Sequence, residues 1–169
     1  MLALIPFLVR EDTRRWAVAL TGTLLATALA VFVLKIAVGR ARPIVALAGV
    51  HPLYGSPTDF SFPSGHAAGS FATAAFVFVV LRRHAELNPA AARAMYLLCS
   101  LCVAVAMTIG YSRVYLGVHF PGDVLTGALL GSIFGAAGGY AYVTRSAEAA
   151  NGDVKSRAKL APEDIAGAD

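Results

Sequence analysis

The chain has 169 residues, of which 57% are hydrophobic and 14% are charged, and its formal net charge is +4 at pH 7. A soluble domain carries about 25% charged residues, so this composition excludes an ordinary soluble protein and places the chain in a lipid bilayer. A positive net charge also suits nucleic-acid binding, but the basic residues here flank apolar segments, as they do at membrane boundaries. We therefore expect the bilayer, and no nucleic acid, as a partner.

Four long segments contain no Asp, Glu, Lys or Arg, namely residues 16–34, 67–81, 94–112 and 124–144. A helix needs about 20 apolar residues to cross a bilayer, and the second segment reaches this length if it extends back through Phe62 and Phe60. The predicted fold is an all-α integral membrane bundle of four helices in one core, residues 16–145. Residues 1–15 form an apolar and basic N-terminal segment, and the polar residues 146–169 are expected to be a disordered tail.

The distribution of Lys and Arg predicts the orientation of the bundle. If the helices alternate in direction, ten of these residues share the side of both termini, and the other side holds Lys35, Arg40, Arg42 and Arg113. Cytoplasmic loops carry the excess of Lys and Arg in membrane proteins. We therefore expect both termini in the cytoplasm and the loop 42–62 on the outer face of the cell membrane.

The last segment carries a stripe of glycines at intervals of four residues: Gly127, Gly131, Gly135 and Gly139. Small residues on one face of a helix allow a second helix to approach closely. We expect this stripe to pack against another helix of the same bundle. A homodimer formed through the stripe is the alternative.

Residues suited to binding phosphate gather at the outer ends of the segments. Arg42 and Arg113 can each present a planar fork to two phosphate oxygens, and Lys35 supplies a compact positive charge. Ser64 and Gly65 lie near the first turn of a helix, where free N–H groups and the helix dipole favour an anion. Such a cage can replace a metal ion, so we expect no metal and no other cofactor.

Cleavage of a phosphoester requires an attacking group and a proton for the departing oxygen, and two histidines can divide these roles. His119 and Asp123 are four residues apart, a spacing that lets the carboxylate orient the imidazole on a helix. His66, on a separate helix, is then free to act as a general acid. Asp59 is set aside as a loop residue, and Arg40 is expected to be a boundary anchor.

Together these residues form three motifs that closely resemble those of the type 2 phosphatidic acid phosphatases, whose superfamily includes vanadium haloperoxidases. The motifs are Lys, six residues and Arg-Pro; Pro-Ser-Gly-His; and Ser-Arg, five residues, His, three residues and Asp. They stand here at residues 35–43, 63–66 and 112–123.

The resemblance implies a metal-independent phosphohistidine mechanism, in which His119 attacks phosphorus, Asp123 orients it and His66 protonates the leaving group. It also implies a set of phosphate-binding residues: Lys35, Arg42, Ser64, Gly65, Ser112 and Arg113.

The implied substrate is a lipid phosphate, with phosphatidic acid, phosphatidylglycerol phosphate and a polyprenyl diphosphate as the candidate classes. Membrane members of this family commonly have six spanning helices, two of them before the first motif, whereas 34 residues precede Lys35 here. Two alternatives to a phosphatase stay open. The first is a truncated or inactive member of the family without enzymatic activity. The second is a protein that holds vanadate and oxidises halide, as the soluble haloperoxidases do.

Overall fold

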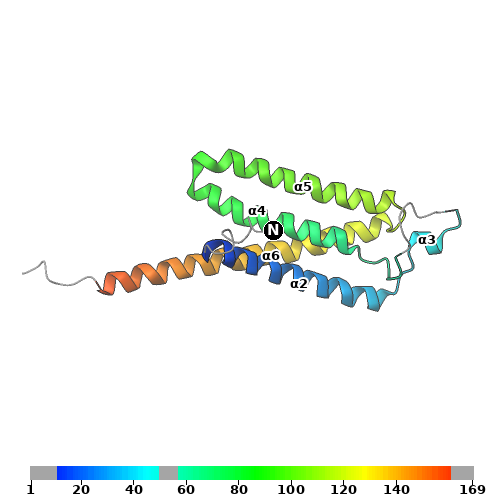
Figure 1. Ribbon diagram of the computed structural model, residues 1–169, viewed down its shortest axis with the longest axis horizontal. Coiled ribbons are helices and arrows are strands. Elements are labelled where there is room, and N and C mark those ends of the chain that lie inside the picture. Colours follow the sequence, from blue (N-terminus) through cyan, green and yellow to red (C-terminus); the bar gives the residue numbers. More distant parts are fainter. Residues whose placement is uncertain (1–10, 50–56, 161–169) are drawn as a thin grey trace, which may run out of the picture.

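The computed structural model describes residues 11–49 and 57–160, and the long helices among them lie side by side in one bundle (Figure 1). These helices are α2 (Glu11–Val38), α4 (Gly65–Leu87), α5 (Ala92–Tyr115) and α6 (Pro121–Leu160). Two short elements lie in the connections, the helix α3 (Pro43–Ala46) and the 3-10 helix η2 (Pro89–Ala91). Within the described residues, four helices are long and apolar enough to cross a membrane, which confirms the predicted all-helical fold.

Helix α4 is the centre of the bundle, since it packs against α2, α5 and α6. Large apolar side chains point outward from the other helices, and Leu25, Leu29, Leu101 and Leu129 are each more than half exposed. A protein in water does not leave so many apolar side chains uncovered. In a bilayer these side chains contact lipid tails, so the bundle is built to be surrounded by hydrocarbon.

The closest helix pair is α4 with α6, and the glycine stripe lies in this contact. A Cβ atom built on Gly131 would lie 2.0 Å from the carbonyl oxygen of Ala68, and one on Gly135 would lie 2.2 Å from that of Ala72. Only a hydrogen atom fits between the two backbones at these points. The prediction that the stripe packs inside the bundle is confirmed, because α4 covers the stripe, and the alternative of a homodimer stays a prediction.

Helix α4 begins later than the sequence suggested. Ser64 is its N-cap, and the Ser64 hydroxyl accepts a hydrogen bond from the Ala67 N–H over 3.4 Å. Phe60 and Phe62 lie before this cap, so the expected extension through them is wrong. The helix gains its length at the other end, where it continues to Leu87.

Helix α6 continues well beyond the expected end of the last span. Its 40 residues correspond to a length of about 60 Å, twice the roughly 30 Å of the hydrocarbon core, and its C-terminal part projects from the bundle (Figure 1). The alanines in this part are strong helix formers. The prediction of a disordered tail is therefore wrong for residues 146–160, while residues 161–169 and 1–10 lie outside the described part of the chain.

The α4–α6 contact predicts unequal effects of two alanine substitutions in the same helix. Gly131→Ala forces the two backbones apart and should lower the free energy of unfolding by about 1–3 kcal/mol. Gly152→Ala is the matched control, because a Cβ at Gly152 meets no atom within 4 Å and alanine favours the helix by about 1 kcal/mol. The measurement is thermal unfolding of both variants in detergent. Equal stability of the two variants would contradict the close packing.

Candidate active site

The three sequence motifs meet at one end of the bundle, where α2 and α5 end and α4 and α6 begin. They surround a cavity of about 590 Å³. Six of the nine predicted site residues line it: Lys35, Arg42, Gly65, His66, Arg113 and His119. The other three, Ser64, Ser112 and Asp123, lie behind the cavity wall.

Arg42 is held rigidly although it lies in a connection between helices. Its side chain is 6% exposed, and its Nη1 donates to the carbonyl oxygen of Val118 over 2.8 Å. Its Nε donates to the backbone oxygen of Asp59 over 2.9 Å. Pro43, directly after it, begins α3 and fixes the backbone there. The guanidinium therefore keeps one orientation at the cavity wall.

The carboxylate of Asp59 joins two of the predicted phosphate-binding cations. Its Oδ1 lies 2.6 Å from Arg42 Nη2, and its Oδ2 lies 2.8 Å from Lys35 Nζ. Burial raises the pKa of Asp59, but the hydrogen bonds and charges of Lys35 and Arg42 outweigh burial and hold the pKa below its ordinary value. Setting Asp59 aside as a loop residue was wrong, because an anion from the chain itself lies between these cations.

His119 is almost fully buried, and its two ring nitrogens face different surroundings. Nε2 lies 3.3 Å from Arg42 Nη1, on the side of the cavity. Nδ1 lies 3.4 Å from the Ser61 hydroxyl and 3.7 Å from Asp123 Oδ2. A proton on Nδ1 is favoured by these oxygen atoms, and Nε2 is then unprotonated and can accept a hydrogen bond from Arg42 Nη1.

The charge state of His119 follows from the same surroundings. Burial and the positive charges of Arg42 and Lys35 together lower its pKa to about 4, because they outweigh the hydrogen bond with Ser61 and the carboxylate of Asp123, which raise it. The imidazole is therefore neutral at neutral pH. A neutral imidazole whose Nε2 carries no proton is the form that can act as a nucleophile.

The carboxylate of Asp123 is completely buried and fully used. It accepts hydrogen bonds from Arg40 Nη1 over 2.9 Å, from the Ser61 hydroxyl over 2.5 Å and from the Phe120 N–H over 2.9 Å. It also lies in the first turn of α6, where the helix dipole stabilises a negative charge. The distance of 3.7 Å from Asp123 Oδ2 to His119 Nδ1 is too long for a hydrogen bond. The Ser61 hydroxyl lies between the two residues and contacts both of them.

Arg40 and Ser61 are site residues that the sequence did not reveal. Arg40 was expected to be a boundary anchor, and this is wrong, because its guanidinium pairs with Asp123 and lies 4.1 Å from the centre of the Phe120 ring. Ser61 belongs to none of the motifs. The sequence held only weak signals for these two site residues. Arg40 is one of the four basic residues on the side of the loop 42–62, and Ser61 stands two residues before Pro63 of the second motif.

The two motif serines make contacts within or beside their own helices. Ser64 caps α4, and its N–H donates to the backbone oxygen of Asp123 over 2.9 Å. The Ser112 hydroxyl donates to the Ile109 carbonyl over 2.7 Å and accepts from Arg113 Nε over 3.1 Å. Ser64 therefore joins the starts of α4 and α6, and Ser112 holds the guanidinium that lines the cavity.

Known proteins resemble this chain over most of its length. Residues 16–147 match the PAP2 superfamily. The undecaprenyl-diphosphatase of Sulfolobus acidocaldarius is 31% identical over 125 residues, which cover 74% of this chain and 54% of that protein. The chain thus spans about half the length of this curated relative.

Two crystal structures share the fold. The PAP2-type phosphatidylglycerolphosphate phosphatase of Bacillus subtilis aligns with a TM-score of 0.63 and 25% identity, over 85% of this chain and 64% of that one. Aquifex aeolicus LpxE aligns with a TM-score of 0.59 and 30% identity, over 81% of this chain and 73% of that one. The profile match, these likenesses and the membrane-spanning bundle agree, and the chain belongs to the PAP2 superfamily of membrane lipid phosphatases.

Proposed function

We propose that this chain hydrolyses a lipid phosphate monoester or diphosphate through a phosphohistidine formed on His119. One observation supports the proposal: a buried, neutral His119 lines a cavity together with Lys35, Arg42 and Arg113, with its Nε2 3.3 Å from Arg42 Nη1 and its Nδ1 3.7 Å from the buried carboxylate of Asp123. The relatives' names refer to undecaprenyl diphosphate and phosphatidylglycerol phosphate. Phosphatidic acid, phosphatidylglycerol phosphate and a polyprenyl diphosphate are the candidate substrates.

In the first step, the Nε2 lone pair of His119 attacks phosphorus and the bond from phosphorus to the lipid oxygen breaks. Negative charge on the transferring group is stabilised by the three cations and by N–H groups near Gly65, at the start of α4. His66 is exposed and lines the same cavity, so it can give its proton to the departing oxygen. The imidazole becomes positively charged, and Asp123 stabilises that charge.

In the second step, water attacks the phosphohistidine and the bond between phosphorus and Nε2 breaks. His66, now neutral, takes a proton from this water, as the reversal of its first role requires. Inorganic phosphate leaves and both histidines return to their starting forms. The lipid product carries a hydroxyl group, or one phosphate fewer if the substrate is a diphosphate.

The three cations supply the charge stabilisation that a metal ion gives in other phosphatases, so the proposed reaction needs no metal. The carboxylate of Asp59 is the anion that pairs with Lys35 and Arg42. A phosphate that reaches Lys35 and Arg42 competes with a carboxylate that is itself 57% exposed, and the exposed side chain has room to turn towards water. Lys35 and Arg42 therefore stay paired with Asp59 until the phosphate dianion of a substrate replaces its carboxylate.

In this proposal the site lies on the outer face of the cell membrane. The start of α2 and the end of α6, which are remote from the site, then lie on the cytoplasmic side. The excess of Lys and Arg at those remote ends supports this orientation. Tyr111 and Tyr115, on the last turns of α5, are both about two-thirds exposed, and their rings stack with centroids 6.2 Å apart. Aromatic side chains of this kind favour the membrane–water boundary, where the phosphate of a lipid substrate lies.

The function is tested by phosphate release from purified protein given the three candidate lipid classes. We expect release from at least one class, unchanged by EDTA, and loss of release in His119→Ala. Arg83→Gln is the control, because Arg83 lies at the other end of α4 and pairs with Glu86.

Each alternative has its own result in the same assay. A folded, helical protein that releases no phosphate from any of the lipids would support the inactive member. Halide oxidation after addition of vanadate would support the haloperoxidase-like activity. Strong inhibition by EDTA would contradict the metal-independent mechanism.

The lowered pKa of His119 predicts its titration in the substrate-free protein. The neutral form should persist down to about pH 4, whereas an ordinary histidine gains its proton near pH 6.5. Lys35→Gln removes one of the charges that disfavour the imidazolium, so the pKa should rise in this variant. The measurement is a histidine ring NMR titration, with His119→Ala used to assign the signal. A midpoint near 6.5 in the unmodified protein would contradict the description of the site.

A further inference from the structure

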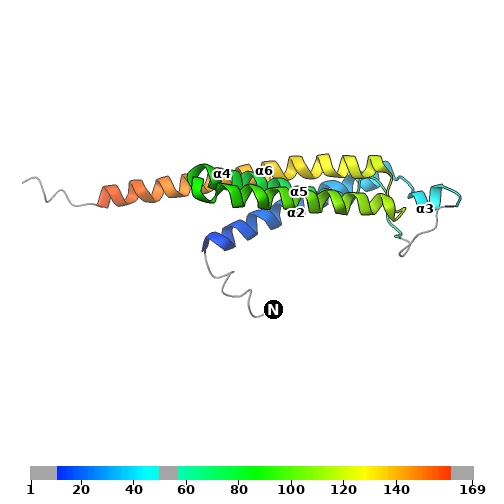
Figure 2. The same cartoon turned by 90° about the horizontal axis from the view of Figure 1, so that it is seen from above.

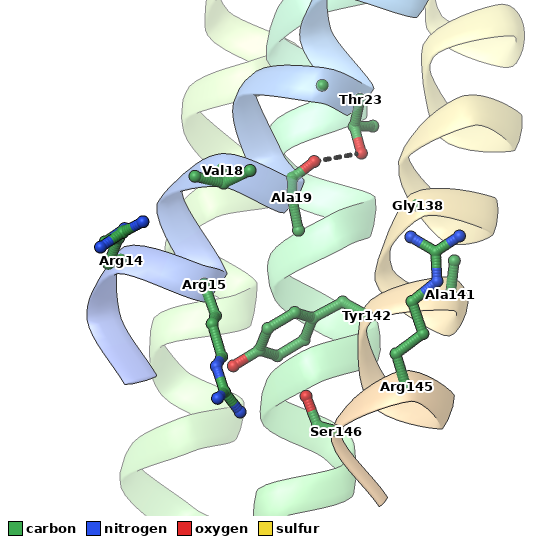
Figure 3. Close-up of a pocket in the computed structure, with 11 residues that line it drawn as sticks. Arg14, Arg15, Val18, Ala19, Thr23, Gly138, Ala141, Tyr142, Arg145 and Ser146 are labelled. Atoms are coloured by element: carbon green, nitrogen blue, oxygen red, sulfur yellow. Dashed lines mark hydrogen bonds between the residues drawn. The ribbon is translucent and has the colours of Figure 1, made fainter. Parts of the chain in front are cut away.

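A second cavity lies at the opposite end of the bundle, between α2 and α6, and has a volume of about 660 Å³ (Figure 3). Figure 2 shows that the beginning of α2 diverges from α6, and the cavity, which we call the wedge, lies between these parts of the two helices. The wedge closes where the helices touch, since a Cβ on Gly138 would lie 2.0 Å from Thr23 Oγ1. The proposed phosphatase reaction does not use this cavity.

The open end of the wedge is strongly basic. Arg14 and Arg15 line it from α2, and Arg145 lines the cavity from α6, with its guanidinium directed along the helix towards Gly138 and Ala141 (Figure 3). The hydroxyl groups of Tyr142 and Ser146 also belong to this end, and the Tyr142 hydroxyl is directed towards Arg15 (Figure 3). The residues that line the cavity, within the described part of the chain, include no Asp or Glu. The composition of this wall suits a phosphate group.

The narrow end of the wedge is apolar and contains small residues. Val18, Ala19, Gly22, Gly138 and Ala141 line it. A Cβ on Gly22 would meet no atom within 4 Å, so this glycine borders open space. From Arg14 to Gly22 the wedge follows eight residues of helix, a depth of about 12 Å. Arginines around an apolar groove of this depth suit a lipid headgroup and the first part of its acyl chain.

We propose that this wedge binds an anionic phospholipid, with the headgroup phosphate on the arginines and one acyl chain along the groove between α2 and α6. Basic pockets between transmembrane helices are known to recognise acidic headgroups. The simpler account is that each arginine is an independent boundary anchor. Arg82 and Arg83, at the same end of α4, fit that account because they do not line this cavity, whereas Arg14, Arg15 and Arg145 line it together from two helices.

The test is a native mass spectrometry titration of the full chain with phosphatidylglycerol, a phosphodiester, and with phosphatidylcholine of the same acyl chains. We expect phosphatidylglycerol to bind more tightly. The double variant Arg14→Gln/Arg145→Gln should weaken this binding by at least about tenfold. The matched control Arg82→Gln/Arg83→Gln removes the same charge from the same end and should bind as the unmodified chain does. Arg113→Gln, in the phosphatase cavity, should also leave this binding unchanged.

Three outcomes would overturn the proposal. Equal binding of the two lipids would show that the headgroup charge is not recognised. Equal weakening by both double variants would show a general effect of surface charge. A dimer that excludes the lipid would show that a second copy of the chain fills the wedge. None of these results depends on phosphate release, so they are independent of the proposed phosphatase reaction.

Discussion

The buried carboxylate of Asp123 is the interaction on which the rest of the site depends. A buried charge without partners costs on the order of several kcal/mol. This one is compensated by Arg40, by the Ser61 hydroxyl and by the N–H of Phe120. Its partners come from the segment after α2, the segment before α4 and the start of α6. One carboxylate therefore holds together three parts of the chain that are distant in sequence and places His119 beside them.

The packing of the bundle serves the same junction. The Ser64 N–H reaches the backbone oxygen of Asp123 over 2.9 Å because α4 and α6 lie in backbone contact. Gly127 continues that contact to the site end of the pair, where a Cβ would lie 2.4 Å from the Ser64 carbonyl oxygen. The glycine stripe thus has a chemical consequence, since a wider separation of the helices would move His119 and Asp123 away from the start of α4.

The electrostatics of the site divide into two regions on either side of the His119 ring. Towards the cavity, burial together with the charges of Arg42 and Lys35 lowers the pKa of His119, so the ring is neutral. Asp59 pairs with both of these cations. In the proposed mechanism, Asp123 behind the ring stabilises the positive charge that forms on attack. The same two cations then bind the phosphate and, with burial, keep the proposed nucleophile unprotonated before the phosphate arrives.

The clustering of the motif residues at one end of the bundle could be predicted from the sequence because they stand at helix ends, while their chemical roles stay a prediction. Lys35, His66 and His119 stand at the boundaries of apolar segments, and adjacent helix ends of an alternating bundle meet at one surface. Arg40, Ser61 and Asp59 could not be assigned in this way, since they lie in a connection whose course depends on tertiary contacts. The length of α6 was also missed, because the change from apolar to polar residues predicts where a span leaves the membrane and not where its helix ends.

The central claim is that Nε2 of His119 carries the phosphoryl group during turnover. The direct measurement is rapid acid-free quenching of the protein with a lipid phosphate substrate, followed by mass spectrometry of its peptides under conditions that preserve phosphohistidine. The account predicts a phosphoryl group on His119 and a larger trapped fraction in His66→Ala given a substrate with a good leaving group, because the second step then lacks its base. Turnover without any phosphoryl group on His119, or with the group on another residue, would contradict it.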